Sequence, residues 1–453
     1  MRLVNVACRA VHLVGVSLLV GGAMWGVEWP GLQHVLWLTI GSGLGLLLRE
    51  VVAEPSWPRN GRGLAAVLKL GPLGLTPLVP DRRESLLLAV VMKDLVRLSL
   101  LATVFVLVSI PAAAEPPAPL PPLTAGKLEQ VELGKLLFFD PRLSGDGGFS
   151  CDTCHDPAKG WGDGKPLSTG YPGSEYFRNS QTLLNAAHYK RNYWDGRMAG
   201  SDQATLVRDH LTEAHFMQVD GRLVTERLKQ IPEYVDAFGK AFGAEPSFGR
   251  TIGAVASFIR TLTSRNVPID RFLKGDTGAL TAEARFGFEL FQGKAGCVRC
   301  HGGPLFSDES FHVLGVPDNP HVFADPFRHI SFRRFFRTLG APGVEGYTTD
   351  PGLYGVTKIR TAWGKFRTPS LREVSRTAPY MHNGTLATLE DVVAFYNAGG
   401  GTHPNKSPLL RPLGLTPGEQ RALVEFLKSL SGDALVIERP ELPDYQPRTL
   451  GKN

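Results

Sequence analysis

The stretch GDGGFSCDTCHDPAKGWGDG, residues 145–164, decides the fold of this chain. It contains the pattern Cys-x-x-Cys-His, which is the attachment signal for c-type haem. Two thiols three positions apart can each bond a vinyl group on one edge of the porphyrin, and the adjacent histidine then becomes the proximal ligand of the iron. The pattern occurs twice and predicts two covalently bound haem c groups, held by Cys151, Cys154 and His155 and by Cys297, Cys300 and His301.

Two other interpretations of the paired cysteines explain less of the pattern. A zinc site would need both pairs to converge, and it would leave the two histidines unexplained. A redox dithiol needs neither a histidine directly after the second cysteine nor a second copy. The fifth cysteine, Cys8, lies alone in an apolar segment, so the cysteines do not form a disulfide framework.

The first 113 residues are predicted to be membrane and targeting sequence. Residues 1–91 contain two apolar runs whose basic flanks place both ends of a hairpin in the cytoplasm. Residues 92–114 have a basic start, a short apolar core and small residues at the end, so they form either a signal peptide or a third membrane helix. We therefore expect a periplasmic protein, either soluble after cleavage or anchored to the inner membrane through residues 1–113.

The rest of the chain is predicted to be mainly α-helical. A Pro/Ala linker, residues 115–125, leads into two cytochrome c-like haem domains that pack together. The first spans residues 126–265 and the second residues 266–432, with one haem motif in each. Residues 433–453 are expected to be a C-terminal tail. Fifty-one glycines and 34 prolines give long loops, which suit a fold wrapped around a prosthetic group.

The charge pattern argues against a nucleic-acid partner. The formal charge of +6 is small for 453 residues, and there is no aromatic–basic stripe of the kind that binds single strands. The stretch FRHISFRRFFR, residues 327–337, is expected to be a basic loop with its aromatic side chains packed inward. The alternative is a docking site for an acidic protein or for lipid head groups.

The second axial position of each iron decides what its haem does. A protein ligand there gives an electron-transfer haem, whereas an open position allows peroxide to bind. No His or Met follows His155 until His188, so we expect an open position at the first haem. The side chains that remain as alternative ligands are His188, His210, His215, Met198 and Met217.

Four segments resemble the di-haem bacterial cytochrome c peroxidases and, within them, the MauG-like branch. They are LGKLLFFDPRLSGDGGFSCDTCHDP (133–157), TLLNAAHYKRNYWDGR (182–197), FELFQGKAGCVRCHGGPLFSD (288–308) and FRTPSLREVSRTAPYMHNGTLATLEDVVAFYNAGG (366–400). The resemblance covers residues 126–432. It implies an enzyme that cleaves hydrogen peroxide at a five-coordinate first haem and uses the second haem to store and relay electrons.

The resemblance also assigns residues around the second haem. MauG-like proteins place a tyrosine on this iron from a segment like AFYNAGG, so Tyr396 is the candidate ligand. Its place on one helix face with Val392 and Val393 agrees with a buried position. A core tyrosine bonded to a carbonyl is the alternative for Tyr396, and Met381 is the rival ligand. Trp194 matches the tryptophan that conducts charge between the two haems.

On the peroxide side of the first haem, the resemblance is less regular. Gln203 and Glu213 keep the ten-residue spacing of the family's distal pair, in which the Glu moves a proton between the peroxide oxygens. However, Val207 stands where the family has proline, and Gln203 lies one residue closer to the preceding tryptophan than the pattern expects. His210 and His215 therefore remain alternative distal groups.

Two further positions bear on cofactors and partners. Asn179 matches the position that binds calcium between the domains, so Ca²⁺ is a candidate cofactor; an ordinary turn residue is the alternative. Ala295 stands where MauG has the surface tryptophan that passes oxidising power to its protein substrate, and Trp363 is the candidate replacement.

Together these features predict a di-haem c-type peroxidase or oxidase. Its reducing partner would be a small redox protein, either a cytochrome or a cupredoxin, or else a side chain of a partner protein. The alternative is a non-enzymatic periplasmic electron-transfer cytochrome in which both irons are six-coordinate.

Overall fold

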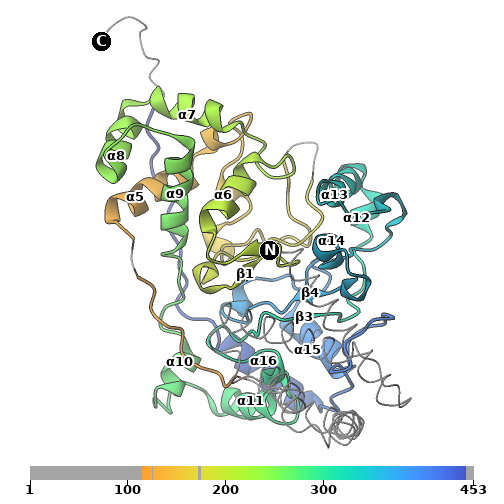
Figure 1. Ribbon diagram of the computed structural model, residues 1–453. Helices are drawn as coiled ribbons and strands as arrows, with labels where there is room; N and C mark the ends of the chain where they lie inside the picture. Colours follow the sequence, from red (N-terminus) through yellow and green to blue (C-terminus); the bar gives the residue numbers. More distant parts are fainter. Residues whose placement is uncertain (1–114, 125, 172–174, 445–453) are drawn as a thin grey trace, which may run out of the picture. The chain divides into compact units, whose positions relative to one another are not determined.

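A computed structural model describes residues 115–124, 126–171 and 175–444 (Figure 1). The predicted membrane hairpin and signal segment lie outside these residues, as does the end of the tail. Among the helices that the structure describes, none is long and apolar enough to cross a membrane. The described residues belong to one compact unit.

The fold is mainly helical, as the sequence predicts, with only two short β-ribbons among the described residues. In one ribbon β1 (Arg191–Asn192) pairs antiparallel with β2 (Met198–Ala199), and in the other β3 (Phe311–His312) pairs antiparallel with β4 (Phe366–Arg367). The helices are α5 (Leu128–Phe138), α6 (Gln203–Thr212), α7 (Gly221–Lys229), α8 (Pro232–Phe242), α9 (Phe248–Ile259), α10 (Pro268–Leu273), α11 (Ala282–Gln292), α12 (His321–Ala324), α13 (Pro326–Thr338), α14 (Tyr354–Thr357), α15 (Leu389–Asn397) and α16 (Pro417–Lys428).

The same helix crossing occurs once in each half of the chain. Helix α5 precedes the first cysteine motif and packs on α9, and α11 precedes the second motif and packs on α16 (Figure 1). A glycine lies at each crossing: a Cβ on Gly134 would come within 2.0 Å of the Ala254 oxygen, and a Cβ on Gly287 within 2.0 Å of the Ala422 oxygen. The backbones approach this closely because glycine has no side chain.

Each half has its own hydrophobic core, and a third cluster joins them. The first core draws its buried residues from positions 133–262 and the second from 267–430. In the third cluster, which also contains Tyr176, Phe177 of the first half packs on Phe332 and Phe336 of the second. The domain boundary at residues 265 and 266 stays a prediction.

An ion pair of the buried Arg178 with Asp350, and hydrogen bonds to the buried Glu309, also connect the two halves. The Arg178 guanidinium is 2.6 Å from the Asp195 carboxylate and 2.7 Å from that of Asp350, and Arg178 and Asp195 are fully buried. The Glu309 carboxylate accepts hydrogen bonds from the backbone N–H groups of Lys190 and Arg191. A buried charge that loses its partner is strongly destabilising, so these pairs fix the halves against each other.

Both ends of the described chain pack on the fold. The linker carbonyl of Ala118 accepts a hydrogen bond from Arg372 Nη2 at 3.1 Å, in the second half. The tail returns to the first half, where the Leu435 carbonyl accepts from Trp161 Nε1 at 2.8 Å and Arg439 donates to the Phe139 carbonyl at 2.8 Å. Residues 433–444 therefore pack against the first half and help to cover its core.

The prediction of a basic loop at residues 327–337 is wrong, because this stretch forms helix α13. The Asp325 side chain caps its first turn, and Pro326 occupies the first helical position, which are both ordinary helix-start signals. Phe332, Phe335 and Phe336 lie on the buried face and pack inward as expected, whereas Phe327 is exposed.

Candidate active site

The first cysteine motif holds His155 in the orientation of an iron ligand. Cys151 begins a single 3₁₀ turn, and the carbonyl of Cys151 accepts the His155 N–H. His155 Nδ1 lies 3.1 Å from the Trp161 carbonyl. A carbonyl only accepts, so Nδ1 carries the proton and Nε2 is left as the metal-binding nitrogen. Burial lowers the pKa of His155, which keeps the ring neutral.

The second motif repeats this arrangement around His301. Cys297 again begins a single 3₁₀ turn whose carbonyl accepts the N–H of the histidine. His301 Nδ1 lies 2.9 Å from the Phe306 carbonyl, and burial lowers the pKa of this ring too. Both sites therefore have the same geometry, with a 3₁₀ turn and a histidine oriented by a backbone carbonyl. Two haem c groups require two such sites.

The thiols themselves do not fit a redox dithiol. None of the four described cysteines forms a disulfide. Burial raises the pKa of Cys151 to about 12, that of Cys154 to about 11 and that of Cys297 to about 12. Reactive dithiols have a lowered pKa, since the thiolate is the nucleophile. The raised pKa values therefore argue against a dithiol that exchanges disulfides.

A cavity of about 590 Å³ opens beside the second motif. Cys297, Cys300 and His301 line it, and so does Arg367, which is fully buried. Arg367 Nη1 has no hydrogen-bond partner and is 3.6 Å from the Glu309 carboxylate. The Arg367 Nε donates to the Tyr193 carbonyl at 3.3 Å, which leaves Nη1 for a further acceptor. The volume lies within the range of cofactor sites, and such a buried N–H donor suits the carboxylate of a haem propionate. The residues present therefore fit a haem.

Tyr396 and Met381 both line this cavity, so the structure brings both candidate ligands to the second haem site. Tyr396 comes from the last turn of α15, and burial together with the thiols of Cys297 and Cys300 raises its pKa. A phenol in this setting stays protonated unless a cation lies next to it, and a haem iron is such a cation. Ligation by Tyr396 stays a prediction.

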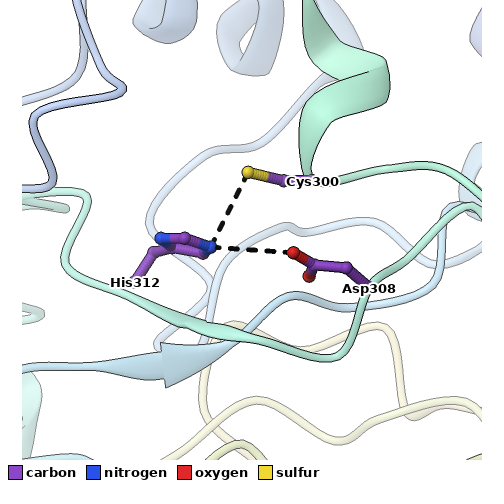
Figure 2. Close-up of side chains that lie close together, drawn as sticks. All are labelled: Cys300, Asp308 and His312. Carbon is purple, nitrogen blue, oxygen red and sulfur yellow. Dashed lines mark hydrogen bonds and ion pairs between the residues drawn. The ribbon is translucent and has the colours of Figure 1, made fainter. Parts of the chain in front are cut away.

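Figure 2 shows His312 between Cys300 and Asp308. His312 Nε2 is 3.6 Å from Cys300 Sγ and 4.0 Å from the Asp308 carboxylate. Three such side chains could hold a metal ion, but the sulfur of Cys300 belongs to a haem-attachment motif. The Asp308 carboxylate and then Cys300 raise the pKa of His312 to about 9. We interpret the cluster as a His312–Asp308 pair beside the attachment point of the second haem.

Trp194 and Asn179 lie together at the junction of the halves. Trp194 Nε1 donates to the Asn179 carbonyl at 3.0 Å, and both residues line the cavity of the second motif. The side-chain nitrogen of Asn179 donates to the Lys165 carbonyl at 2.8 Å. Trp194 is thus placed between the first half and the second haem site, whereas the calcium assignment of Asn179 stays a prediction.

Three of the predicted distal residues come together at the end of helix α6. The rings of His210 and His155 are 6.2 Å apart. His210 Nδ1 lies 2.9 Å from the Leu206 carbonyl, so its Nε2 is also left over. One turn on, Glu213 Oε2 is 3.0 Å from His215 Nε2.

Gln203 lies differently from its expected distal role. Its side-chain nitrogen donates to the Gly200 carbonyl at 2.9 Å, at the start of the same helix, and its Oε1 is buried without a hydrogen-bond partner. The Gln203 amide therefore stabilises the start of helix α6. A direct contact of Gln203 with peroxide stays a prediction.

The remaining candidates occupy other places. Met217 is buried in the first core and Met198 lies in β2. The charges of Arg372 and Arg260 act on His188, whose pKa is lowered mainly by burial. Ala295 is buried in the second core, so it offers no surface group. Trp363 is half-buried against Tyr347 and Tyr354, with ring centres 4.9 Å apart in both cases.

Sequence reasoning missed the groups that orient the site, namely Trp161, Phe306, Arg367 and Asp195. The first two act through backbone carbonyls, which carry no side-chain signal. The charged residues were visible, but their pairing depends on segments far apart in the chain.

Comparisons with known proteins agree with this geometry. The family model of the di-haem cytochrome c peroxidases matches residues 128–278. The chain is 54% identical to cytochrome-c peroxidase IdrP2 of Pseudomonas sp. (strain SCT), over 74% of this chain and 90% of that one. It is 38% identical to methylamine utilization protein MauG of Methylorubrum extorquens, over 70% and 82%. It is 34% identical to cytochrome c551 peroxidase of Pseudomonas aeruginosa, also over 70% and 82%.

Solved structures extend the likeness to the fold. A MauG-like protein associated with microbial copper homeostasis superposes with a TM-score of 0.58 at 27% identity, over 73% of this chain and 97% of that one. The di-haem peroxidase BthA of Burkholderia thailandensis gives a TM-score of 0.54 at 23% identity, over 72% and 91%. With relatives matched over most of their length and both cysteine motifs in the same geometry, this chain belongs to the di-haem cytochrome c peroxidase family, a family of oxidoreductases.

Proposed function

We propose that this chain reduces hydrogen peroxide at the first haem site, with electrons that a small redox protein delivers through the second. The observation that carries the proposal is a difference between two otherwise matching sites. The ring of His210 lies 6.2 Å from that of His155, and Glu213 follows His210 by one turn of chain, whereas Tyr396 and Met381 line the cavity of the second motif. Acid–base groups beside one iron and protein ligands beside the other suit a reaction site and an electron-transfer site.

Haem supplies the iron that binds peroxide and the electrons that cleave it. In this proposal His155 and His301 bind iron through Nε2, each oriented by a backbone carbonyl. Glu213 takes a proton from the inner peroxide oxygen and returns it to the outer oxygen, which leaves as water. Trp194 would carry charge between the halves, and Tyr396 would bind the second iron.

The proposed reductant is a cytochrome or a cupredoxin. Buried Ala295 supports it, because the exit residue of MauG has no counterpart there. The 54% identity to a protein named cytochrome-c peroxidase, against 38% to MauG, points the same way. Oxidation of a partner-protein side chain is the second candidate, which a Tyr396 ligand would favour.

We propose a periplasmic location and a calcium site on less direct grounds. Haem c is attached outside the cytoplasm, and residues 92–114 have the features of an export segment. Residues 1–113 would then be removed in part or hold the enzyme at the inner membrane. Asn179 directs its amide nitrogen to the Lys165 carbonyl, which leaves its side-chain oxygen for a cation.

Steady-state oxidation of a reduced partner tests the proposal. With both haems in place, the protein should oxidise two equivalents of reduced small cytochrome or cupredoxin for each peroxide consumed. His155→Gly should abolish this reaction while the second haem is still reduced by the same donor. Peroxide-independent electron exchange with the donor, and no peroxide consumption, would instead identify a non-enzymatic carrier.

A further inference from the structure

Glu213 and His215 form a carboxylate–imidazole pair directly after helix α6. Glu213 is the residue that caps the helix, and its N–H still donates to the Asp209 carbonyl. The chain then turns sharply, because the Glu213 carbonyl accepts the N–H groups of Phe216 and Gln218. This turn brings the side chains of positions i and i+2 together, with His215 Nε2 at 3.0 Å from Glu213 Oε2.

Aromatic rings from three segments hold the His215 imidazole in place. Tyr176 stacks on it with ring centres 5.3 Å apart and planes 8° apart. Phe216 lies at 4.3 Å, and Phe335 of helix α13 meets its edge at 5.6 Å. The His215 side chain is only 9% exposed, whereas that of Glu213 is 34% exposed. The ring is thus fixed with Nε2 toward Glu213 Oε2, and both of these atoms are buried and have no other hydrogen-bond partner.

The pair lies next to the first haem site. Phe216 stacks on His210 at 4.4 Å on one side and touches His215 on the other. The ring of His210 is in turn 6.2 Å from the ring of His155, the proximal histidine. Glu213 and His215 therefore lie one ring away from the histidine that faces His155.

We propose that His215 is the proton-exchange partner of Glu213, so that an imidazole–carboxylate pair, and not a single carboxylate, performs the acid–base step on peroxide. This rests on the proposed function. One proton leaves the inner peroxide oxygen and is shared between Glu213 and His215. It then moves to the outer oxygen as the O–O bond breaks, and that oxygen leaves as water. The two electrons come from the haem, and the pair ends as it began.

The charges around the pair support proton exchange between Glu213 and His215. Burial lowers the pKa of His215, and the Arg197 and Arg334 guanidinium groups lower it further, against the opposing effect of Glu213. His215, Arg197 and His210 hold the pKa of Glu213 below its ordinary value, although burial opposes them. At neutral pH the pair is one carboxylate and one neutral imidazole, which together can accept one proton. Below the lowered pKa of His215 the pair is already protonated and cannot.

Two substitutions separate proton exchange from simple positioning. His215→Asn keeps a side-chain donor toward Glu213 but cannot titrate, and His215→Phe keeps the stack on Tyr176 but has no N–H. Stopped-flow mixing of the ferric di-haem protein with hydrogen peroxide, from pH 5 to pH 8, gives the second-order rate and its pH profile. Covalent haem content and the resting spectrum serve as controls for folding.

Both variants should react about 10- to 100-fold more slowly than the unaltered protein and lose its decline at acidic pH, while Glu213→Gln should lose about 10²- to 10⁴-fold. A wild-type rate and pH profile in His215→Asn would overturn proton exchange. Wild-type behaviour in both His215 variants, with Glu213→Gln impaired, would overturn the pair while leaving the proposed function intact. Wild-type behaviour in Glu213→Gln as well would remove Glu213 itself from the mechanism.

Discussion

If Tyr396 binds the second iron as proposed, peroxide is expected to produce a long-lived, two-electron-oxidised form, and replacing Tyr396 with phenylalanine is expected to abolish it, with two covalent haems per chain retained. Tyr396 lines the second haem cavity from the end of α15, where a phenolate on iron would stabilise ferric and higher oxidation states. Absorption spectra after one equivalent of peroxide would show the form as a main species in the unaltered protein and as undetectable in Y396F.

Met381→Leu is the matched control, because Met381 lines the same cavity. It should leave both the resting spectrum and the oxidised form unchanged. If Met381→Leu alters the spectrum of the second haem and Tyr396→Phe does not, the axial assignment is wrong and methionine is the ligand.

Alanine at Gly134 or at Gly287 should destabilise the protein strongly and to a similar extent. In each case the added Cβ would lie 2.0 Å from a backbone oxygen of the facing helix, so the helices must move apart. Overpacking of a core costs roughly 1–3 kcal/mol, and we expect the upper end or more, since backbone cannot rotate away as a side chain can. Thermal unfolding of the haem-loaded protein measures this as a lower midpoint.

Gly239→Ala supplies the control for helix propensity. Gly239 lies inside helix α8, and a Cβ there meets nothing within 4 Å. This change should stabilise the protein by about 0.5–1 kcal/mol. If the alanine variants of Gly134, Gly287 and Gly239 all unfold at the same temperature, the close helix crossings do not require glycine.

The sequence was sufficient for the haem sites because their chemistry is local. Two cysteines and a histidine within five residues specify attachment and the proximal ligand together, and both histidines lie as that pattern requires. The mainly helical fold followed from the same motifs and from the family segments around them.

The contacts that assemble the site could not be read in the same way. The pairing of Glu213 with His215 depends on a turn after α6, and the ring that fixes His215 comes from Tyr176. Arg178 forms an ion pair with Asp350, which lies 172 positions away in the sequence. Such long-range partners are set by the packing of the two halves and not by local spacing.

Helix α13 was a different kind of failure. Its start signals, Asp325 and Pro326, were present in the sequence, and its phenylalanines at 332, 335 and 336 follow the spacing of a buried helix face. The arginines between these phenylalanines favoured the interpretation of a charged loop. Here the hydrophobic period was the more reliable signal.

The room-temperature spectrum of the purified ferric protein tests the central claim most directly, namely that one of two covalent haems keeps a coordination position for peroxide. The account predicts one high-spin signal, from the haem on His155, and one low-spin signal, from the haem on His301. Two low-spin haems in every redox state, or a chain without covalently attached haem, would contradict it.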